Sequence, residues 1–435
     1  MTFPLEMLSS VSVDNPVSYL VFALVGVAFG YTLESAGFGD SRKLAAQFYF
    51  REFTVLKVMF TAIAVASVLL FGAVGLGILD LHLIWVNPTY LGSGIVGGLI
   101  MGVGFIIGGF CPTTSLASSS TGRIDGMMFM AGGFVGAAFF AETELQFDYW
   151  HNNAGYLGRF TLDQLFGLPA PVIVLIIVLV AILAFWGAEQ LERINGKKDL
   201  RNEPGLRKVG AVVLAAAAVG VVMIGSPTLE DNYQKLTFKR TETVASKDNG
   251  KADPVTHEYS ADEMLAKRLA FVSPAEAFKV QYQQSLKPVY LDVRNEIDFN
   301  LYHLDGAEHV PMERLPDVVQ KLLAEPPSNT VFITMSNDEK AAVQAWKHLV
   351  ASGVQNVYVL EGGVNNWIET FGETDNLQKI VSAVEGDDQL HYVFDAVLGD
   401  RYASCAPSPI ENEALKFTPR IVMQIGRDKS GGGCG

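Results

Sequence analysis

The chain has 435 residues, of which 49% are hydrophobic and 18% are charged, and its formal net charge at pH 7 is −14. A chain this acidic, without a basic patch to neutralise phosphates, is excluded from the nucleic-acid-binding class. Its mean hydropathy of +0.26 is too high for an entirely soluble protein with this share of charged residues, so the composition predicts membrane-spanning segments.

Six apolar runs occupy the first half of the chain, at residues 17–36, 54–79, 93–110, 127–141, 170–188 and 209–225. Several approach the ~20 residues that a helix needs to cross a bilayer. We therefore expect an α-helical polytopic membrane domain of about six helices over residues 1–225. The run at 127–141 is short, which indicates a tilted or half-crossing helix buried in the bundle. No Lys or Arg precedes the first run, so we expect it to stay as a helix rather than to be removed as a secretory signal.

Loop charges predict how the helices are oriented. Every second loop carries basic residues, namely Arg42, Lys43, Arg51, Arg123, Arg193, Lys197, Lys198, Arg201, Arg207 and Lys208. The alternating loops are mainly acidic, with Arg159 as their only Lys or Arg. By the positive-inside rule the basic loops face the cytoplasm of a bacterial cell. Both termini of this multi-pass inner-membrane protein are then expected in the periplasm.

The third apolar run leads into a helix break. It contains Gly94, Gly98 and Gly102 at intervals of four, a spacing that lets helix backbones approach closely. Pro112 follows and interrupts the helix. A broken helix at membrane depth is tolerated where protein or a water-filled cavity covers it, and transporters usually place their sites there. The break therefore predicts a substrate site formed by Cys111, Thr113, Thr114 and Ser115.

Two residues near the break have a second interpretation. Free cysteine is usually a small buried hydrophobe, so Cys111 could serve packing alone. The amides and hydroxyls beside it favour an anion site instead. Glu34 ends the first predicted helix, where a carboxylate either anchors the helix at the membrane surface or takes part in function. Both interpretations of Glu34 stay open.

The second half of the chain reads as a separate domain. Residues 226–259 turn polar and are expected to be a mobile linker. Over residues 260–372, short β-rich runs at 289–293, 330–334 and 356–360 alternate with helical stretches such as 339–352. This alternation predicts a soluble α/β domain, a parallel sheet with helices on both faces. Residues 373–435 show weak periodicity and are expected to form a tail.

Residues 260–372 resemble a rhodanese homology domain through Asp292-Val293-Arg294, His303 to Ala307, Gly362-Gly363 and Trp367. In that family a cysteine begins a six-residue loop and becomes a persulfide, favoured by the loop amides and the following helix N-terminus. The loop here reads Met335-Ser336-Asn337-Asp338-Glu339-Lys340. A thioether cannot become a persulfide, and Asp338 and Glu339 would repel an anionic sulfur donor. We therefore expect a catalytically inactive domain that serves docking or binding.

The membrane half resembles the YeeE/YedE family of thiosulfate and sulfur transporters over residues 17–141. The resemblance is carried by Gly30 to Asp40, Phe50 to Lys57 and Gly109 to Thr113. It implies that membrane-embedded cysteines pass thiosulfate along by transient sulfur contacts, and Cys111 is the cysteine at a matching position. Family members carry two such halves, whereas this sequence shows one. A homodimer or a partner membrane subunit is therefore expected.

The last residues, Gly431-Gly432-Gly433-Cys434-Gly435, resemble the Gly-Gly-Cys-Gly-Gly terminus of the sulfur carrier in the periplasmic thiosulfate-oxidising (Sox) system. The resemblance implies that Cys434 bears sulfur cargo on a flexible glycine arm. The alternative is a disordered terminus with an incidental cysteine. A Cys405–Cys434 disulfide also stays open for a periplasmic tail.

These patterns together predict transport or handling of thiosulfate or another sulfane-sulfur species by a protein in contact with membrane lipid. The second hypothesis is a non-transporting accessory subunit of a larger membrane complex, with the rhodanese-like domain as its docking surface. The third is a sulfurtransferase that uses Cys434. The seven histidines lack ligand spacing and no haem-attachment motif occurs, so we expect no metal and no organic cofactor.

Overall fold

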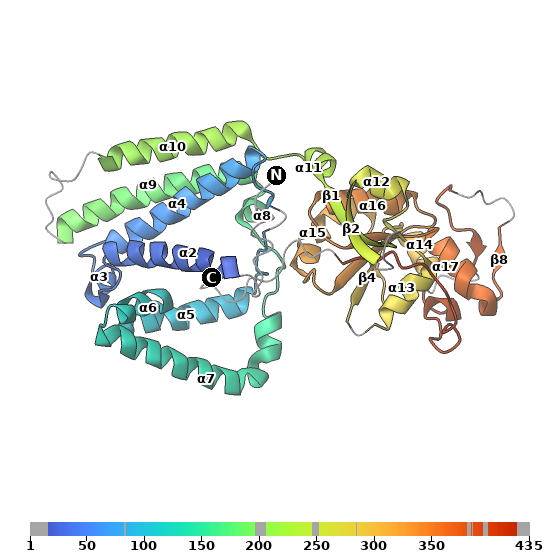
Figure 1. Ribbon diagram of the computed structural model, residues 1–435, viewed down its shortest axis with the longest axis horizontal. Coiled ribbons are helices and arrows are strands. Elements are labelled where there is room, and N and C mark those ends of the chain that lie inside the picture. The colour runs from blue at the N-terminus through green and yellow to red at the C-terminus, as the bar shows by residue number, and fades with distance from the viewer. Residues whose placement is uncertain are drawn as a thin grey trace. The chain divides into compact units, whose positions relative to one another are not determined.

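The computed structural model describes residues 16–81, 84–195, 206–245, 252–283, 285–380, 384, 386–394 and 399–423 (Figure 1). The chain separates into two compact units. The helical unit comprises the described residues of 16–81 and 88–227, and the α/β unit comprises those of 228–423. Each unit is described by itself below.

A helix forms at each of the six apolar runs of the helical unit. These helices are α2 (Pro16–Ser35), α4 (Thr54–Gly75), α5 (Leu91–Gly108), α7 (Ile124–Asn153), α9 (Ala170–Asn195) and α10 (Leu206–Ile224). Three short helices, α3 (Ser41–Ala45), α6 (Pro112–Ser120) and α8 (Leu162–Phe166), lie in the connections. The predicted helical membrane domain is confirmed, and the chain is a multi-pass membrane protein.

Within the described residues, fewer helices than the six that we predicted are long and apolar enough to cross a membrane. Four helical stretches of the described chain are long and apolar enough to cross a membrane: α4, Leu91–Ser120, α7 and α9. A fifth is reached if α10 and α11 (Leu229–Lys235), which are bent by 81° at their junction, count as one span. The described side chains of α2 form a shorter apolar helix.

Helix α7 differs from the short, buried element that we predicted for 127–141. It has 30 residues, because Glu142, Thr143 and Glu144 end the apolar run without ending the helix. Glutamate favours helix almost as much as leucine does, so the polar end of the run gives no stop signal. Gly126 is its one buried residue, and the side chains of Phe134 and Val135 are exposed within this chain.

Helices α4, α9 and α10 pack against one another. Their shared core consists of small and β-branched side chains: Ala64, Val68, Val174, Val178, Ala181, Ala218 and Val221. Small residues let these backbones come close, which is the usual basis of helix packing in a membrane. The glycines of α5 behave differently, because a Cβ placed on Gly94, Gly98 or Gly102 would meet no described atom within 4 Å. The stripe on α5 is therefore not used for packing within the described chain.

The α/β unit is built on a five-stranded parallel sheet with strand order β3-β7-β6-β4-β5. The strands are β3 (Phe271–Val272), β4 (Lys287–Asp292), β5 (Glu308–His309), β6 (Thr330–Met335) and β7 (Val357–Leu360). Every residue of the central strand β6 is buried, including Thr330 and Thr334 near its ends, which fits a strand that shows no alternation of apolar and charged residues. The predicted parallel sheet is confirmed.

Helices cover both faces of this sheet. Successive strand residues point to opposite faces, so Leu291 and Phe332 pack with α12 (Ala261–Ala266), α15 (Leu315–Ala324) and α16 (Lys340–Ala351). Tyr290 and Ile333 pack on the other face with α13 (Pro274–Gln281) and α17 (Gly363–Phe371). Helix α14 (Glu296–Leu301) and the 3-10 turn Met312–Arg314 connect β4, β5 and α15.

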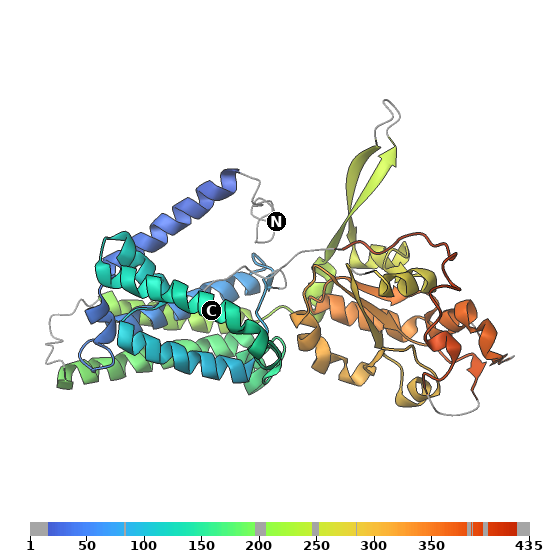
Figure 2. The same ribbon diagram turned by 90° about the horizontal axis from the view of Figure 1, so that it is seen from below.

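The segment expected to be a mobile linker, 226–259, is largely ordered. It contains α11 and an antiparallel hairpin of β1 (Thr237–Ala245) and β2 (Ala252–Ser260), visible as the long two-stranded ribbon in Figure 2. Strand β1 contains Thr241, Thr243 and Val244. Such β-branched residues favour strands even where charged residues lie between them. At its base, Phe238 stacks on Trp346 of α16 at 5.9 Å between ring centroids.

The segment after residue 373, expected to be a tail of weak periodicity, has described residues that pack into the α/β core. The main-chain carbonyl of Ser404 accepts a 2.8 Å hydrogen bond from Trp367, and its hydroxyl accepts one of 2.9 Å from Tyr302. Glu276 accepts hydrogen bonds from the amides of Arg420 and Ile421. Two short strands, β8 (Gln378–Lys379) and β9 (Tyr392–Val393), and the 3-10 turns Gly372–Asp375 and Ala403–Cys405 complete the segment.

Candidate functional site

The predicted break between α5 and α6 is formed by three consecutive local signals. Gly109 ends α5 in the left-handed conformation, with φ of 72°. Cys111 caps α6 in an extended conformation, and Pro112 occupies the first helical turn, where its missing N–H costs nothing. The amide of Cys111 donates to the hydroxyl of Thr114 at 2.9 Å, and that hydroxyl lies 3.3 Å from the Cys111 sulfur. The thiol is therefore held at the N-terminus of a short helix.

A second break, between α2 and α3, meets the first. The carbonyl of Gly39 accepts hydrogen bonds from Ser118 at 3.0 Å and from Arg123 at 2.7 Å. A Cβ on Gly109 would lie 3.0 Å from the Cβ of Ser41, so only glycine permits this approach. Beneath the two breaks, apolar side chains form a small core of Phe38, Leu44, Val55 and Phe110. Two irregular backbone segments thus cover one another inside the helical unit.

Glu34 joins the same region. Its carboxylate lies 3.7 Å from the guanidinium of Arg123, and both side chains are about two-fifths exposed. A Cβ on Gly39 would come within 2.5 Å of the Glu34 carboxylate, so this acid lies directly over the α2–α3 break. Glu34 and Arg123 are therefore a partly exposed ion pair beside the α2–α3 break rather than a buried charge.

The predicted site residues differ in how far they are exposed. Cys111 and Thr113 are half-buried, whereas Thr114 and Ser115 are buried. The Ser115 hydroxyl donates to the carbonyl of Pro112 at 2.7 Å, so it stabilises the first turn of α6. Ser118 and Arg123 also contact this region through Gly39, although we did not predict them as parts of the site. Their polarity is visible in the sequence, but only the fold brings Gly39 to them.

The loop that resembles the rhodanese active-site loop follows the buried strand β6 in the α/β unit. Met335 is fully buried at the end of the strand, and Ser336, Asn337 and Asp338 are buried after it. Gly363 lies against the loop with φ of +60°, and a Cβ there would collide with the main-chain oxygen of Asp338. The amide of Val364 donates to Ser336 O at 2.9 Å. The loop carbonyls therefore face α17, and glycine is the residue that fits.

The amides of this loop are taken by a carboxylate from the same chain. Asp388 accepts from the amide of Asp338 through one oxygen and from the amide of Ala341 through the other, both at 2.8 Å. These amides lie at the N-terminus of α16, where the helix dipole favours an anion. A cavity of about 150 Å³ adjoins this contact and is lined by Val293, Arg294, Asn295, Asp298, Ser336, Asn337, Ala341 and Asp388.

The charged residues of the loop are engaged by neighbours. Glu339 accepts from Arg268 at 2.6 Å and from the amide of Gly362 at 2.7 Å, and the hydrogen bond that Arg268 donates to Glu339 raises the pKa of Arg268. Asp338 accepts from Asn365 and from the amide of Gly386, each at 2.8 Å. Glu339 therefore points away from the loop amides. Lys340 begins α16.

The two remaining cysteines, Cys405 and Cys434, differ in what the structure says of them. Cys405 is buried with 3% of its surface exposed, and burial raises the pKa of its thiol to about 11. A thiol with so high a pKa is a poor nucleophile. Cys434 lies outside the described residues, and so does the question of a Cys405–Cys434 bond.

Comparison with known proteins finds a family match in each of the two units. A family model described as "Sulphur transport" matches residues 36–245, and one described as "Rhodanese-like domain" matches residues 276–370. The chain is similar to the thiosulfate sulfurtransferase GlpE of Pseudomonas entomophila (strain L48), with 27% identity over 104 residues, or 24% of this chain and 89% of that protein. It is similar to the protein of that name from Tolumonas auensis, with 26% identity over 83 residues, or 19% of this chain and 74% of that protein.

Proposed function

From a chain that carries a sulphur transport domain followed by a rhodanese-like domain, we propose that the helical unit conducts thiosulfate or another sulfane-sulfur anion across a bacterial inner membrane. The observation that carries the proposal is the meeting of the α2–α3 and α5–α6 breaks around Cys111. Irregular backbone within a membrane is energetically costly, because every main-chain polar group there must find a hydrogen-bond partner. It is tolerated where protein covers it or where it lines a water-filled cavity.

The chemistry of this region suits an anion. The N-terminus of α6 carries a partial positive charge, and Cys111 and Thr113 are half-buried at that end of the helix. A thiol next to a passing sulfane sulfur offers a soft, polarisable contact that water does not. Arg123 adds a cation near the entrance, partly balanced by Glu34 at 3.7 Å. Arg123 would attract the anion, and the nearby Glu34 carboxylate would weaken that attraction enough to let the anion leave.

Replacing Cys111 by alanine tests this proposal. Cells that produce the chain are expected to take up radiolabelled thiosulfate, and the variant Cys111→Ala should lower the rate by about tenfold or more, the ~1.4 kcal/mol of one lost contact to a charged ligand. Ser120→Ala, an exposed position on the same helix, serves as the matched control and should leave the rate unchanged. Membrane levels of all variants are compared by immunoblot. Undiminished uptake by Cys111→Ala would favour the accessory-subunit hypothesis.

We further propose that the helical unit works as a homodimer or with a partner membrane subunit. The open faces of Gly94, Gly98 and Gly102 on α5 support this, because small residues at this spacing allow a second helix to approach closely. With all six apolar helices of the unit as spans, the charge of the loops supports an orientation with both termini, and hence the α/β unit, in the periplasm.

The rhodanese-like domain is proposed to bind or dock rather than to catalyse. Two observations support this. Met335 stands where the resemblance requires the sulfur-accepting cysteine, and it is fully buried. The Asp388 carboxylate already occupies loop amides at the N-terminus of α16. Neither a persulfide nor an anionic donor would find its usual partners there.

Cys434 is proposed to carry sulfur cargo on its glycine arm. Mass spectrometry of the intact chain, purified without reductant from cells grown with thiosulfate, should reveal a sulfur or thiosulfonate adduct that peptide mapping places on Cys434. Cys405, buried and with a raised pKa, is the internal control and should stay unmodified. An unmodified Cys434, or a plain Cys405–Cys434 disulfide, would rule out the carrier role.

A further inference from the structure

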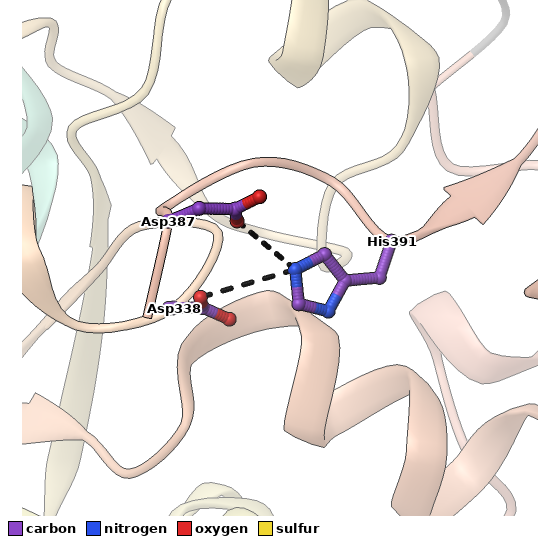
Figure 3. A group of neighbouring side chains, drawn as sticks. All are labelled: Asp338, Asp387 and His391. Carbon is purple, nitrogen blue, oxygen red and sulfur yellow. Dashed lines mark hydrogen bonds and ion pairs between the residues drawn. The ribbon is translucent and has the colours of Figure 1, made fainter. Parts of the chain in front are cut away.

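Three side chains converge where the segment 386–391 crosses the loop after β6. Figure 3 shows the carboxylates of Asp338 and Asp387 and the imidazole of His391 directed at one another. The His391 Nε2 atom lies 3.1 Å from an oxygen of Asp387 and 4.0 Å from one of Asp338. All three ligand atoms lie within 4.8 Å of one another. The spacing of these residues along the chain does not reveal this group.

The group of Asp338, Asp387 and His391 contains two carboxylates and one imidazole. Among the described residues, His391 is the one ion-pair partner of Asp338 or Asp387. Asp388 brings a third carboxylate to the same loop through its bonds to Asp338 N and Ala341 N. His391 and Asp338 are more than nine-tenths buried, so water screens their charges weakly. A cation between the two carboxylates would relieve this repulsion.

Neighbouring donors hold the Asp338 side chain in place. Its Oδ2 atom, the oxygen nearest His391, accepts from the amides of Gly386 and Asp388, and its Oδ1 atom accepts from Asn365. Asn365 in turn accepts from the amide of His391 at 2.9 Å. Hydrogen bonds to ligand side chains are what orients them in a metal site. They fix Asp338 and the backbone of His391 before any ion is bound.

We propose that Asp338, Asp387 and His391 bind a divalent metal ion of the zinc class, with the remaining position open. One imidazole and two carboxylates form a donor set that suits zinc and its transition-metal neighbours. Bonds of ~2.0–2.2 Å place neighbouring tetrahedral ligands about 3.3–3.6 Å apart. The observed 3.1 and 4.0 Å bracket this range, so small side-chain shifts complete the site.

Such an ion would join two segments of the α/β unit, and this effect does not depend on membrane transport. It would fasten the segment 386–391 to the loop 335–340, because Asp338 belongs to one and Asp387 and His391 to the other. Asp388 lies between the two latter ligands, so the ion would hold its carboxylate on the loop amides. Occupancy of the metal site would thus determine how firmly the Asp388 carboxylate is held on the amides of Asp338 and Ala341.

Metal binding is measured on the full chain in detergent, stripped with EDTA and titrated with zinc by calorimetry. The wild type is expected to bind one more zinc ion than Asp387→Asn or His391→Ala. His257→Ala, an exposed histidine on β2, is the matched control and should bind like the wild type. Asp387→Asn keeps the size of a surface side chain, so loss of binding there cannot be assigned to misfolding. Equal zinc stoichiometry in the wild type and Asp387→Asn would overturn the proposal.

Hydrogen–deuterium exchange provides a readout at the loop itself. Zinc should slow exchange of the amides of Asp338 and Ala341, the two that donate to Asp388. The same amides in Asp387→Asn should exchange at one rate with and without zinc. Equal slowing in the variant would place the ion elsewhere and also overturn the assignment. Cobalt, used in place of zinc, should give the visible absorption of a four-coordinate ion in the wild type and lose it in the variant.

Discussion

The variant Glu192→Ala is expected to melt well below the wild type in detergent, because it breaks a buried ion pair of the helical unit. The Glu192 side chain is fully buried and accepts from Lys57 at 2.8 Å and from the amide of Phe53 at 2.6 Å. Removing one partner of a buried pair costs about 3–5 kcal/mol, since the other charge is left without compensation. The pair joins the start of α4 to the end of α9, so its loss loosens both.

Scanning fluorimetry of the purified full chain measures this effect. Arg193→Ala, an exposed neighbour on the same helix, is the matched control and should shift stability by no more than about 0.5 kcal/mol. The double variant Lys57→Met/Glu192→Leu should recover most of the loss, because an apolar pair of similar size needs no desolvation. If Glu192→Ala melts with the wild type, the pair does not hold α4 to α9.

Restoring the missing cysteine should not by itself restore sulfur transfer. We expect no transfer from thiosulfate to cyanide by the wild type or by Met335→Cys, because Asp388 still occupies the amides of Asp338 and Ala341. The double variant Met335→Cys/Asp388→Asn should gain about tenfold or more over that background. An amide side chain cannot accept both bonds, so the α16 N-terminus becomes free to favour a thiolate.

The choice of asparagine keeps the test specific. Asp388 has φ of 59°, a left-handed conformation that asparagine also adopts readily, so the backbone is not strained by the change. Asp388→Asn with Met335 retained is the control and should stay inactive. Activity in Met335→Cys alone would show that Asp388 does not close the loop, and a double variant without activity would place the block at another residue, such as Asp338.

Much of the fold could be predicted because its signals are local. The strands predicted at 330–334 and 356–360 appear as β6 and β7, and the helix predicted at 339–352 appears as α16 (Lys340–Ala351). The secondary structure of such hydrophobic runs follows from neighbouring residues and can be predicted without knowing the contacts between distant parts of the chain. The break at Pro112 belongs to the same class, because proline interrupts a helix wherever it falls in the interior.

The features that could not be predicted from the sequence depend on contacts between residues that are distant along the chain. Nothing near Asp388 in the sequence indicates that its carboxylate meets the amides of the loop after β6. Likewise, Gly39 could be paired with Ser118 only after α2 and α6 were placed side by side. The length of α7 was misjudged for a different reason, since apolarity marks the membrane-facing part of a helix and not its ends.

The packing of residues 399–423 also bears on where this folding unit ends. The rhodanese family match stops at residue 370, yet Trp367, Tyr302 and Tyr358 satisfy their polar atoms on Ser404 and Val422 beyond that limit. A core shared in this way unfolds as one cooperative body. The segment after the family match is therefore part of the interior of this unit, and a chain cut at residue 370 would expose Tyr302, Tyr358 and Trp367, the aromatic side chains that this segment now covers.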